Sequence, residues 1–402
     1  MTSKQNYYAL SERLALLGVL GLGFSIPLAT SLLSLFTILI LVCWLIGKKF
    51  KNGPLLLRTN PVACVAFLLF AGLVLGMTYG PANKDEALGW LVKYRELLLV
   101  VVLIPFLAEE RARAWAMYAF FAGVFVSLLI SFGMGLGVLP FKQAWGPSIL
   151  SRITHSAFVA YFAFWAAHRF FSDDNKKWLW LLALILGVYN IFFMIASRTG
   201  YVIFVLLALL FIYQRFSWRY RLIGVGLLVA MLAVFLSLSG KFSGRISETG
   251  AGYQEYGANA EQYTDGLGYR LEFMENAWNL IRQKPILGYG TGSFPKVYAS
   301  VARLTGRVPT DNPHNEYMLL AIQLGLPGVM LFVGLFGVMW RYARMLPEHD
   351  TWLAQGLVVT MGSGCFVNSW LLDAHEGHFF AYFTAVFFAS LVVRPGKNRS
   401  PA

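Results

Sequence analysis

Apolar runs of about 20 residues recur along this chain and limit what it can fold into. Each is long enough to cross a bilayer as an α-helix, whose backbone hydrogen bonds are satisfied internally. Only 13% of the 402 residues are charged, against about 25% in soluble domains. We expect an all-α integral membrane protein with about twelve transmembrane helices, over roughly 12–27, 28–47, 60–79, 88–107, 113–139, 152–169, 178–196, 200–214, 220–239, 326–342, 351–372 and 377–393.

One long polar segment interrupts this pattern. From about Lys241 to Asn315 the chain becomes hydrophilic. It divides the chain, taken as one structural domain, into spans one to nine (1–240), a polar loop (241–325), and the last three spans with a short tail (326–402). A membrane protein with one sizeable polar loop is expected to work at that face.

The distribution of Lys and Arg predicts the orientation, because basic residues accumulate in cytoplasmic connections. Nineteen of the 33 basic residues lie in the even-numbered connections and the two termini, whereas the short odd-numbered loops hold Lys84, Lys142, Arg152 and Arg198. Both termini are therefore expected in the cytoplasm and the 241–325 loop outside. The net charge of +13 is scattered over many loops, which argues against nucleic-acid binding.

Several other classes of site find no support. The N-terminus has no cleavable signal pattern, so the first helix is expected to remain. Cys43, Cys64 and Cys365 fall inside predicted spans without metal-ligand spacing. No pair of broken helices repeats in inverted order, which lowers the expectation of a secondary transporter.

The polar loop has distinguishable parts. Residues 241–265 show no helical period and are expected to be irregular. Apolar residues then recur at helical spacing from Leu271 to Ile281, which predicts an amphipathic helix that ends before Pro285 and carries Arg270 in its first turn. Arg270 is either a solvated or paired arginine or a ligand-binding cation.

Two further pieces complete the loop. The glycines between Pro285 and Phe294 predict a turn that packs closely between helices, since a phosphate-binding loop would need a following Lys-Ser/Thr. Asn312 and Pro313 predict a helix start, with His314 in the first turn and a break at Gly325. The helix dipole would then keep the imidazole neutral, although a solvated or capping histidine is an alternative.

Charged residues also lie in or beside predicted spans. Arg198 is expected at the outer end of the seventh span, where a helix C-terminus suits a cation. Lys93 and Arg95 lie within the fourth span, where they either pair with Glu96 or face a polar cavity. Residues 373–378 hold two acidic residues and two histidines, but their loose spacing gives little support to a metal site.

These residues suggest one chemistry. Arg198, Arg270 and His314 would gather at the outer face, with Lys93 and Arg95 below them. Arginines recognise diphosphate, and a neutral histidine can take a proton from a hydroxyl. A lipid-linked diphosphate is already a good leaving group, so the reaction would need neither a metal nor a cofactor.

At these positions the chain resembles the O-antigen ligase / O-antigen polymerase superfamily of bacterial inner-membrane glycosyltransferases. The resemblance rests on Ser197-Arg198-Thr199-Gly200, on Arg270 ahead of Trp278, on Pro285 to Gly290 followed by Phe294, and on Pro313-His314-Asn315-Glu316-Tyr317. These motifs occur in the family's order around one large loop. The resemblance is specific over about 195–330; elsewhere it rests on hydropathy and length.

The resemblance implies a GT-C-like fold in the inner membrane, with the large loop and the active site in the periplasm. The donor would be an O-antigen glycan on undecaprenyl diphosphate, and the acceptor a hydroxyl of lipid A–core. Arg198 and Arg270 would hold the diphosphate, with Lys93, Arg95 and Asn315 as further substrate contacts. His314 would act as general base in an inverting, metal-independent transfer.

Three alternatives remain at this point. An O-antigen polymerase or a protein O-oligosaccharyltransferase would use the same donor with another acceptor. A transporter or flippase for polyisoprenyl lipids would explain the membrane helices and the cations, but not a neutral histidine beside arginines on a large outer loop.

Overall fold

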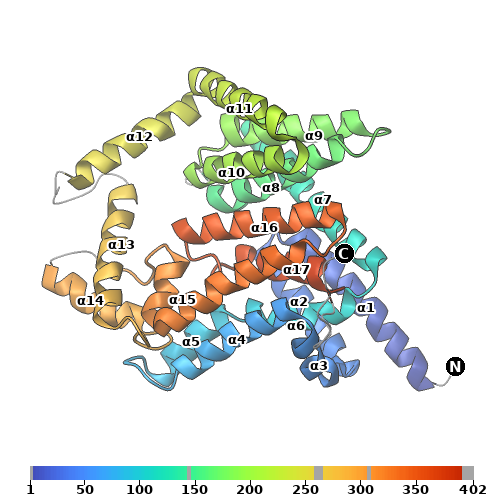
Figure 1. The fold of residues 1–402 in the computed structure, drawn as a ribbon, viewed down its shortest axis with the longest axis vertical. Coiled ribbons are helices and arrows are strands. Elements are labelled where there is room, and N and C mark those ends of the chain that lie inside the picture. The colour runs from blue at the N-terminus through green and yellow to red at the C-terminus, as the bar shows by residue number, and fades with distance from the viewer. Residues whose placement is uncertain (1–2, 143–145, 258–265, 306–308, 392–402) are drawn as a thin grey trace.

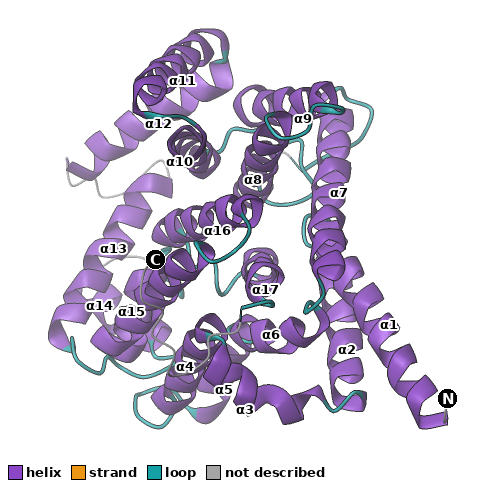
Figure 2. Cartoon of the chain, turned by 45° about the vertical axis from the view of Figure 1, so that its right-hand side comes forward, coloured by secondary structure: helices purple, strands orange, loops and turns teal. Residues whose placement is uncertain are grey.

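The computed structural model describes residues 3–142, 146–257, 266–305 and 309–391, and all regular elements within them are helices (Figure 2). The first part of the chain forms α1 (Ser3–Ser25), α2 (Thr30–Ile46), η1 (Lys49–Asn52), α3 (Gly53–Thr59), α4 (Pro61–Gly76), α5 (Lys84–Lys93), α6 (Glu96–Leu103), η2 (Ile104–Phe106), α7 (Glu110–Gly135) and α8 (Arg152–Phe170). The remainder forms α9 (Lys177–Tyr189), η4 (Asn190–Met194), α10 (Arg198–Arg215), α11 (Trp218–Leu238), α12 (Gly240–Gly257), α13 (Gly266–Gln283), α14 (Phe294–Thr305), α15 (Glu316–Ala343), α16 (Glu348–Val367) and α17 (Ala374–Phe388).

Five of the described helices are long and apolar enough to cross a membrane, and a sixth crossing arises if α2 and the segment 49–59, bent by 77°, form one broken span. The five are Glu110–Gly135, Lys177–Met194, Arg198–Arg215, Trp218–Leu238 and Glu316–Ala343. The chain is thus an all-helical protein with multiple candidate membrane spans. Each of the twelve predicted spans overlaps at least one helix, but length and composition do not confirm the count of twelve.

The predicted fourth span is not one continuous helix. α5 ends at Lys93 and α6 begins at Glu96, so Tyr94 and Arg95 lie at a break. The buried Tyr94 hydroxyl donates a hydrogen bond of 2.8 Å to Glu316 of α15. The break thus places Lys93 and Arg95 beside a turn, with both side chains exposed at the surface of the protein.

An aromatic core holds α7, α8 and α17 together. Phe121 and Trp165 stack with centroids 4.0 Å apart, and rings from α7, α8 and α17 extend this cluster. By contrast, α11 is almost entirely exposed, with only 6% of its most apolar stretch buried inside the protein. An apolar helix that is exposed on most faces fits contact with lipid.

Residues 241–265 differ from the sequence prediction. The part of this segment that the structure describes is helical, because α12 spans Gly240–Gly257; residues 258–265 lie outside the described chain. The polar side chains that argue against a helix are satisfied on the helix itself. The Thr249 hydroxyl donates to the Arg245 carbonyl at 2.7 Å, and Arg245 and Glu248 form an ion pair.

The predicted amphipathic helix is confirmed as α13, which ends two residues before Pro285. The face that α13 buries differs from the predicted stripe: Phe273, Ala277 and Leu280 pack with α14 and the start of α15 in a second core, separate from the aromatic one, whereas Trp278 is exposed. This core includes Phe273, Leu280, Tyr298 and Ile322. Figures 1 and 2 show α12, α13 and α14 together on one side of the bundle.

The glycine turn between α13 and α14 packs as predicted. Gly288, Gly290 and Gly292 all have positive φ, which favours glycine. A Cβ on Gly290 would clash with the backbone carbonyl of Tyr79. The predicted break at Gly325 is also confirmed, since this residue has φ +66° within α15.

Candidate functional site

A cavity of about 660 Å³ lies where helix ends from distant parts of the chain converge. We call it the arginine cavity, because its lining includes Arg152, Arg198, Arg245 and Arg270. These residues come from the first residue of α8, the first residue of α10, the flank of α12 and the N-terminal part of α13, and the last turn of α16 closes another side. Four guanidinium groups around one cavity suit a ligand with several negative charges.

Arg198 begins a helix, contrary to the prediction that it follows the end of one. The preceding span ends in η4, and Ser197 caps α10 by accepting a hydrogen bond of 3.2 Å from the Gly200 backbone amide. The positive end of the α10 dipole therefore adds to the charge of Arg198, so both favour an anion in the cavity.

Arg270 joins the arginine cavity to a second, smaller one. It lies in the second turn of α13, one turn later than predicted, because the helix already begins at Gly266. Gly266 and Arg270 also line a cavity of about 350 Å³ with Tyr269, Phe273 and His314. Arg270 donates a hydrogen bond of 3.4 Å to the Val367 carbonyl. The two predicted arginines thus share one cavity, and His314 lies in the adjoining cavity.

His314 lies before the helix rather than in its first turn. Asn315 is the N-cap of α15 and accepts a hydrogen bond of 3.1 Å from the Met318 amide. The Asn312 side chain accepts instead from the His314 amide at 2.8 Å, which forms an Asx turn. His314 adopts φ +53°, a left-handed conformation in which histidine is enriched among non-glycine residues.

A hydrogen-bond chain orients the imidazole. Asn368 Nδ2 donates to Asp373 Oδ2 at 2.8 Å, so its Oδ1, 2.9 Å from His314 Nδ1, serves as acceptor. His314 Nδ1 therefore carries the proton, and Nε2 on the other side of the ring keeps the lone pair. The ring of Phe273 stacks against the imidazole with centroids 6.2 Å apart.

The surroundings keep His314 neutral by a route other than the helix dipole. Burial lowers the pKa of the imidazole below its ordinary value of 6.5; the hydrogen bond to Asn368 opposes this shift, and the charge of Arg270 adds to it. Burial raises the pKa of Asp373, while the charge of Lys93 opposes that rise. His314 is thus an unprotonated base near neutral pH.

The other predicted site residues, Lys93, Arg95 and Asn315, line neither of these two cavities. Lys93 Nζ lies 4.6 Å from the centroid of the Trp90 ring. Its positive charge also favours the ionised form of Asp373. Arg95 pairs with Glu96 at 3.2 Å, which is one of the two predicted outcomes for this residue. Asn315 is buried, and its side-chain oxygen caps α15.

Sequence reasoning missed three residues of the site. Arg245 lies in the segment expected to be irregular, and only its i,i+3 spacing from Glu248 hinted at a helix. Arg152 stands out in the sequence only as one of the few basic residues in the short odd-numbered loops. Asn368, the C-cap of α16, carries no sequence signal that distinguishes it from an ordinary helix end.

Asn368 also lines a third cavity, of about 600 Å³. Its lining combines apolar residues with polar and acidic ones, among them Ser151, Thr154, Asp373 and Glu376. Among the described residues, no group of three or more His, Cys, Asp or Glu side chains is arranged to hold a metal ion. Asp373 instead accepts from Asn368, and Glu376 accepts from Thr154 at 2.6 Å.

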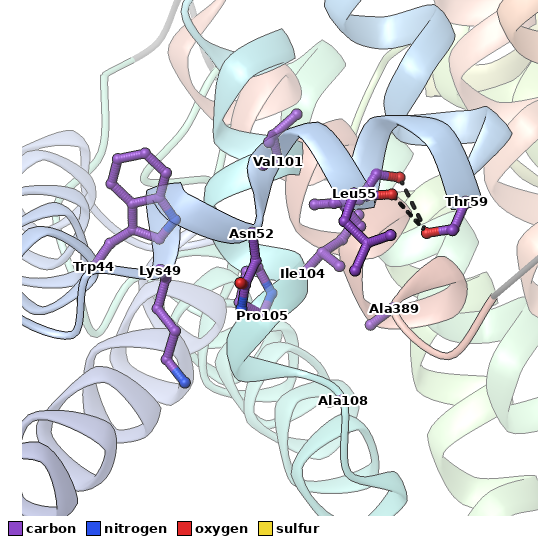
Figure 3. A pocket seen from close by; sticks show the side chains of 12 residues that line it. Trp44, Lys49, Asn52, Leu55, Thr59, Val101, Ile104, Pro105, Ala108 and Ala389 are labelled. Atoms are coloured by element: carbon purple, nitrogen blue, oxygen red, sulfur yellow. Dashed lines mark hydrogen bonds between the residues drawn. The ribbon is translucent and has the colours of Figure 1, made fainter.

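A further cavity of about 330 Å³ lies elsewhere, at the elbow between α2 and α3 (Figure 3). Its lining is mostly apolar, with Trp44, Leu55 and Ile104, and Lys49 is its one charged member among the described residues. The Thr59 hydroxyl donates a hydrogen bond of 2.9 Å to the Leu55 carbonyl. This lining offers no acid–base pair, so we place the site at the arginine cavity.

One comparison with known proteins gives a match that overlaps part of the site. The family model described as O-antigen ligase matches residues 181–333, a range that contains Arg198, Arg245, Arg270 and His314 but neither Arg152 nor Asn368. A search of the curated proteins gives no match. This match, together with the motifs that it contains, supports the O-antigen ligase / O-antigen polymerase superfamily over residues 181–333.

Proposed function

We propose that this protein is an O-antigen ligase that transfers a glycan from undecaprenyl diphosphate to a hydroxyl of lipid A–core. The observation that carries the proposal is the shared position of Arg270, which lines the arginine cavity and also the cavity of His314. A group that binds the leaving diphosphate is thereby adjacent to a group that can accept the hydroxyl proton. The family match supports the same class of enzyme.

The reaction would be a direct displacement. The acceptor oxygen attacks the anomeric carbon while the bond from that carbon to the diphosphate oxygen breaks, and the configuration inverts. The hydroxyl proton goes to His314 Nε2, and the electron pair leaves on the diphosphate, whose charge Arg198 and Arg270 hold. Arg152 and Arg245 would add to this charge stabilisation, and the imidazolium afterwards returns its proton to water.

The arrangement would need no metal and no cofactor. Guanidinium groups form bidentate hydrogen bonds with phosphate oxygens, and the diphosphate departs without an acid catalyst. Lys93, Arg95 and Asn315 remain candidate substrate contacts. Lys93 would act through its charge near Asp373, Arg95 from the break beside Glu96, and Asn315 through the backbone that it caps.

We place this chemistry at the periplasmic face of the inner membrane, with both termini in the cytoplasm and a GT-C-like arrangement of about twelve spans. Residues 241–325 would form the outer catalytic segment between the membrane parts 1–240 and 326–402. The excess of basic residues in the other connections supports this orientation.

A reconstituted transfer assay tests the proposal. The purified protein is incubated with an undecaprenyl-diphosphate glycan and lipid A–core, with EDTA and without nucleotide. We expect ligated lipopolysaccharide from the wild type and almost none from His314→Ala. Glycan elongation in the absence of lipid A–core would identify a polymerase instead, and strict dependence on a divalent ion would contradict the two-arginine mechanism.

A further inference from the structure

We propose that the Glu248 carboxylate occupies the diphosphate-binding position of the arginine cavity in the free enzyme. It thereby weakens the binding of diphosphate, so that the polyprenyl diphosphate product is released after transfer. This inference rests on the proposed function only in that the ligand is a lipid diphosphate. It assigns Glu248 a role in substrate and product affinity and not in the chemical step.

Glu248 is the one acidic residue among those that line the arginine cavity in the described part of the chain. Its Oε2 lies 3.5 Å from a terminal nitrogen of Arg198 and also forms an ion pair with Arg245. Arg152 also lies close to this group. The charges of Arg198, Arg245 and Glu248 all interact with the charge of Arg152. One carboxylate oxygen thus bridges two guanidinium groups from different helices, as a phosphate oxygen would.

The carboxylate of Glu248 is more exposed to solvent than the two guanidinium groups that it pairs with. The side chain of Glu248 is 51% exposed, whereas those of Arg198 and Arg245 are 31% and 21% exposed. The carboxylate can therefore rotate toward solvent on the surface of α12 without opening the bundle. The arginines would stay in place for the incoming phosphates.

The charges predict what this exchange does to affinity. A bound diphosphate would meet like-charge repulsion from Glu248 and would have to replace its pairs with Arg198 and Arg245. The carboxylate therefore competes with donor and product alike. After transfer, Glu248 can restore its pairs with the arginines as the diphosphate product departs, which favours turnover over tight product binding.

Binding of farnesyl diphosphate, a short polyprenyl diphosphate, tests this directly. The purified full-length protein in detergent is titrated as wild type, Glu248→Gln and Glu275→Gln. Glu275 is a matched control, because it is an exposed carboxylate on the adjacent α13 that accepts from the Tyr256 hydroxyl and is not among the lining residues of the cavity. Both substitutions remove one negative charge from the same outer region.

We expect Glu248→Gln to bind farnesyl diphosphate about ten-fold more tightly than the wild type, since water screens a half-exposed charge and keeps the gain moderate. Glu275→Gln should bind like the wild type. In the transfer assay, added diphosphate product should inhibit Glu248→Gln at correspondingly lower concentration.

Unchanged or weaker binding by Glu248→Gln would overturn the proposal, because Glu248 would then only organise the arginines. A similar gain in Glu275→Gln would also overturn it, by reducing the effect to net charge. If farnesyl diphosphate did not bind the wild type at all, or bound Arg198→Gln equally well, the proposed function itself would fail, which is a distinguishable result.

Discussion

Asn368 Oδ1 lies 2.9 Å from His314 Nδ1, and the Asn368 amide nitrogen is itself committed to Asp373. An asparagine held in this way cannot donate to the histidine, so it selects one tautomer of the ring. The base nitrogen is then Nε2, on the side of the ring away from Asn368. Asn368 is a positioning residue, since it acts through His314.

Substitution of Asn368 tests this role through the pH dependence of the reaction. Asn368→Ala should lower kcat by about 10- to 100-fold while KM for the donor changes little, because the base loses its orientation. Asn368→Asp should keep an acceptor but add a negative charge that stabilises the imidazolium, so the acid limb of the pH–rate profile should move to higher pH. An unaltered profile in both variants would reduce Asn368 to a helix cap.

His314→Ala should fold, bind the lipid-linked donor and transfer almost nothing. Loss of a positioned general base typically costs about 10² to 10⁴ in rate. Turnover and donor binding are measured in the same preparation. Near-native turnover, or a product that retains the donor's anomeric configuration, would exclude the base mechanism.

The wild-type pH–rate profile should report the lowered pKa of His314. Burial and the charge of Arg270 disfavour the imidazolium, so the base should stay unprotonated below its ordinary pKa of 6.5. Activity should therefore persist at pH 6.5 and fall on the acid side as the pH drops through the lowered value. A midpoint of this limb above 6.5 in kcat/KM would mean that another group controls the rate or that His314 lies beside a carboxylate in the active state.

The four arginines of the cavity should differ in the size of their effects. Arg198→Ala and Arg270→Ala should abolish transfer, since each leaves phosphate charge without its cation. Arg152→Ala and Arg245→Ala should mainly raise the donor KM. Lysine should rescue Arg198 and Arg270 poorly because it lacks the planar fork. Full activity of Arg270→Ala would return it to the role of a surface arginine.

Cysteine labelling tests the orientation in the membrane. Single cysteines at Tyr253 and Ser300, both exposed, should react with an impermeant reagent from the periplasm, and one at the exposed Asn175 should not. The background is a variant without Cys43, Cys64 and Cys365. Labelling of position 253 only after the inner membrane is opened would invert the topology and exclude a periplasmic site.

Local patterns in the sequence were sufficient for several features. The apolar period of α13, the three glycines of the turn and the break at Gly325 depend on neighbouring residues, so the chain itself carries the signal. The helical character of α12 was missed, because its sequence is rich in Gly and Ser and shows no apolar period, whereas in the structure Ser247 and Thr249 bond back to the helix itself. Likewise, the helix that follows His314 starts at Glu316, since Asn315 rather than Asn312 provides the cap.

By itself, the sequence determined a helical membrane protein and named Arg198, Arg270 and His314 as candidates, because membrane-length apolar runs and family motifs are local in the chain. Only the tertiary structure decided that the two arginines share a cavity with Arg152 and Arg245, that Glu248 lies among them, and that Asn368 orients His314. These relations join residues up to 118 positions apart, from Arg152 to Arg270. Charge and hydrogen bonding act over a few ångströms of space, so sequence separation does not reveal them.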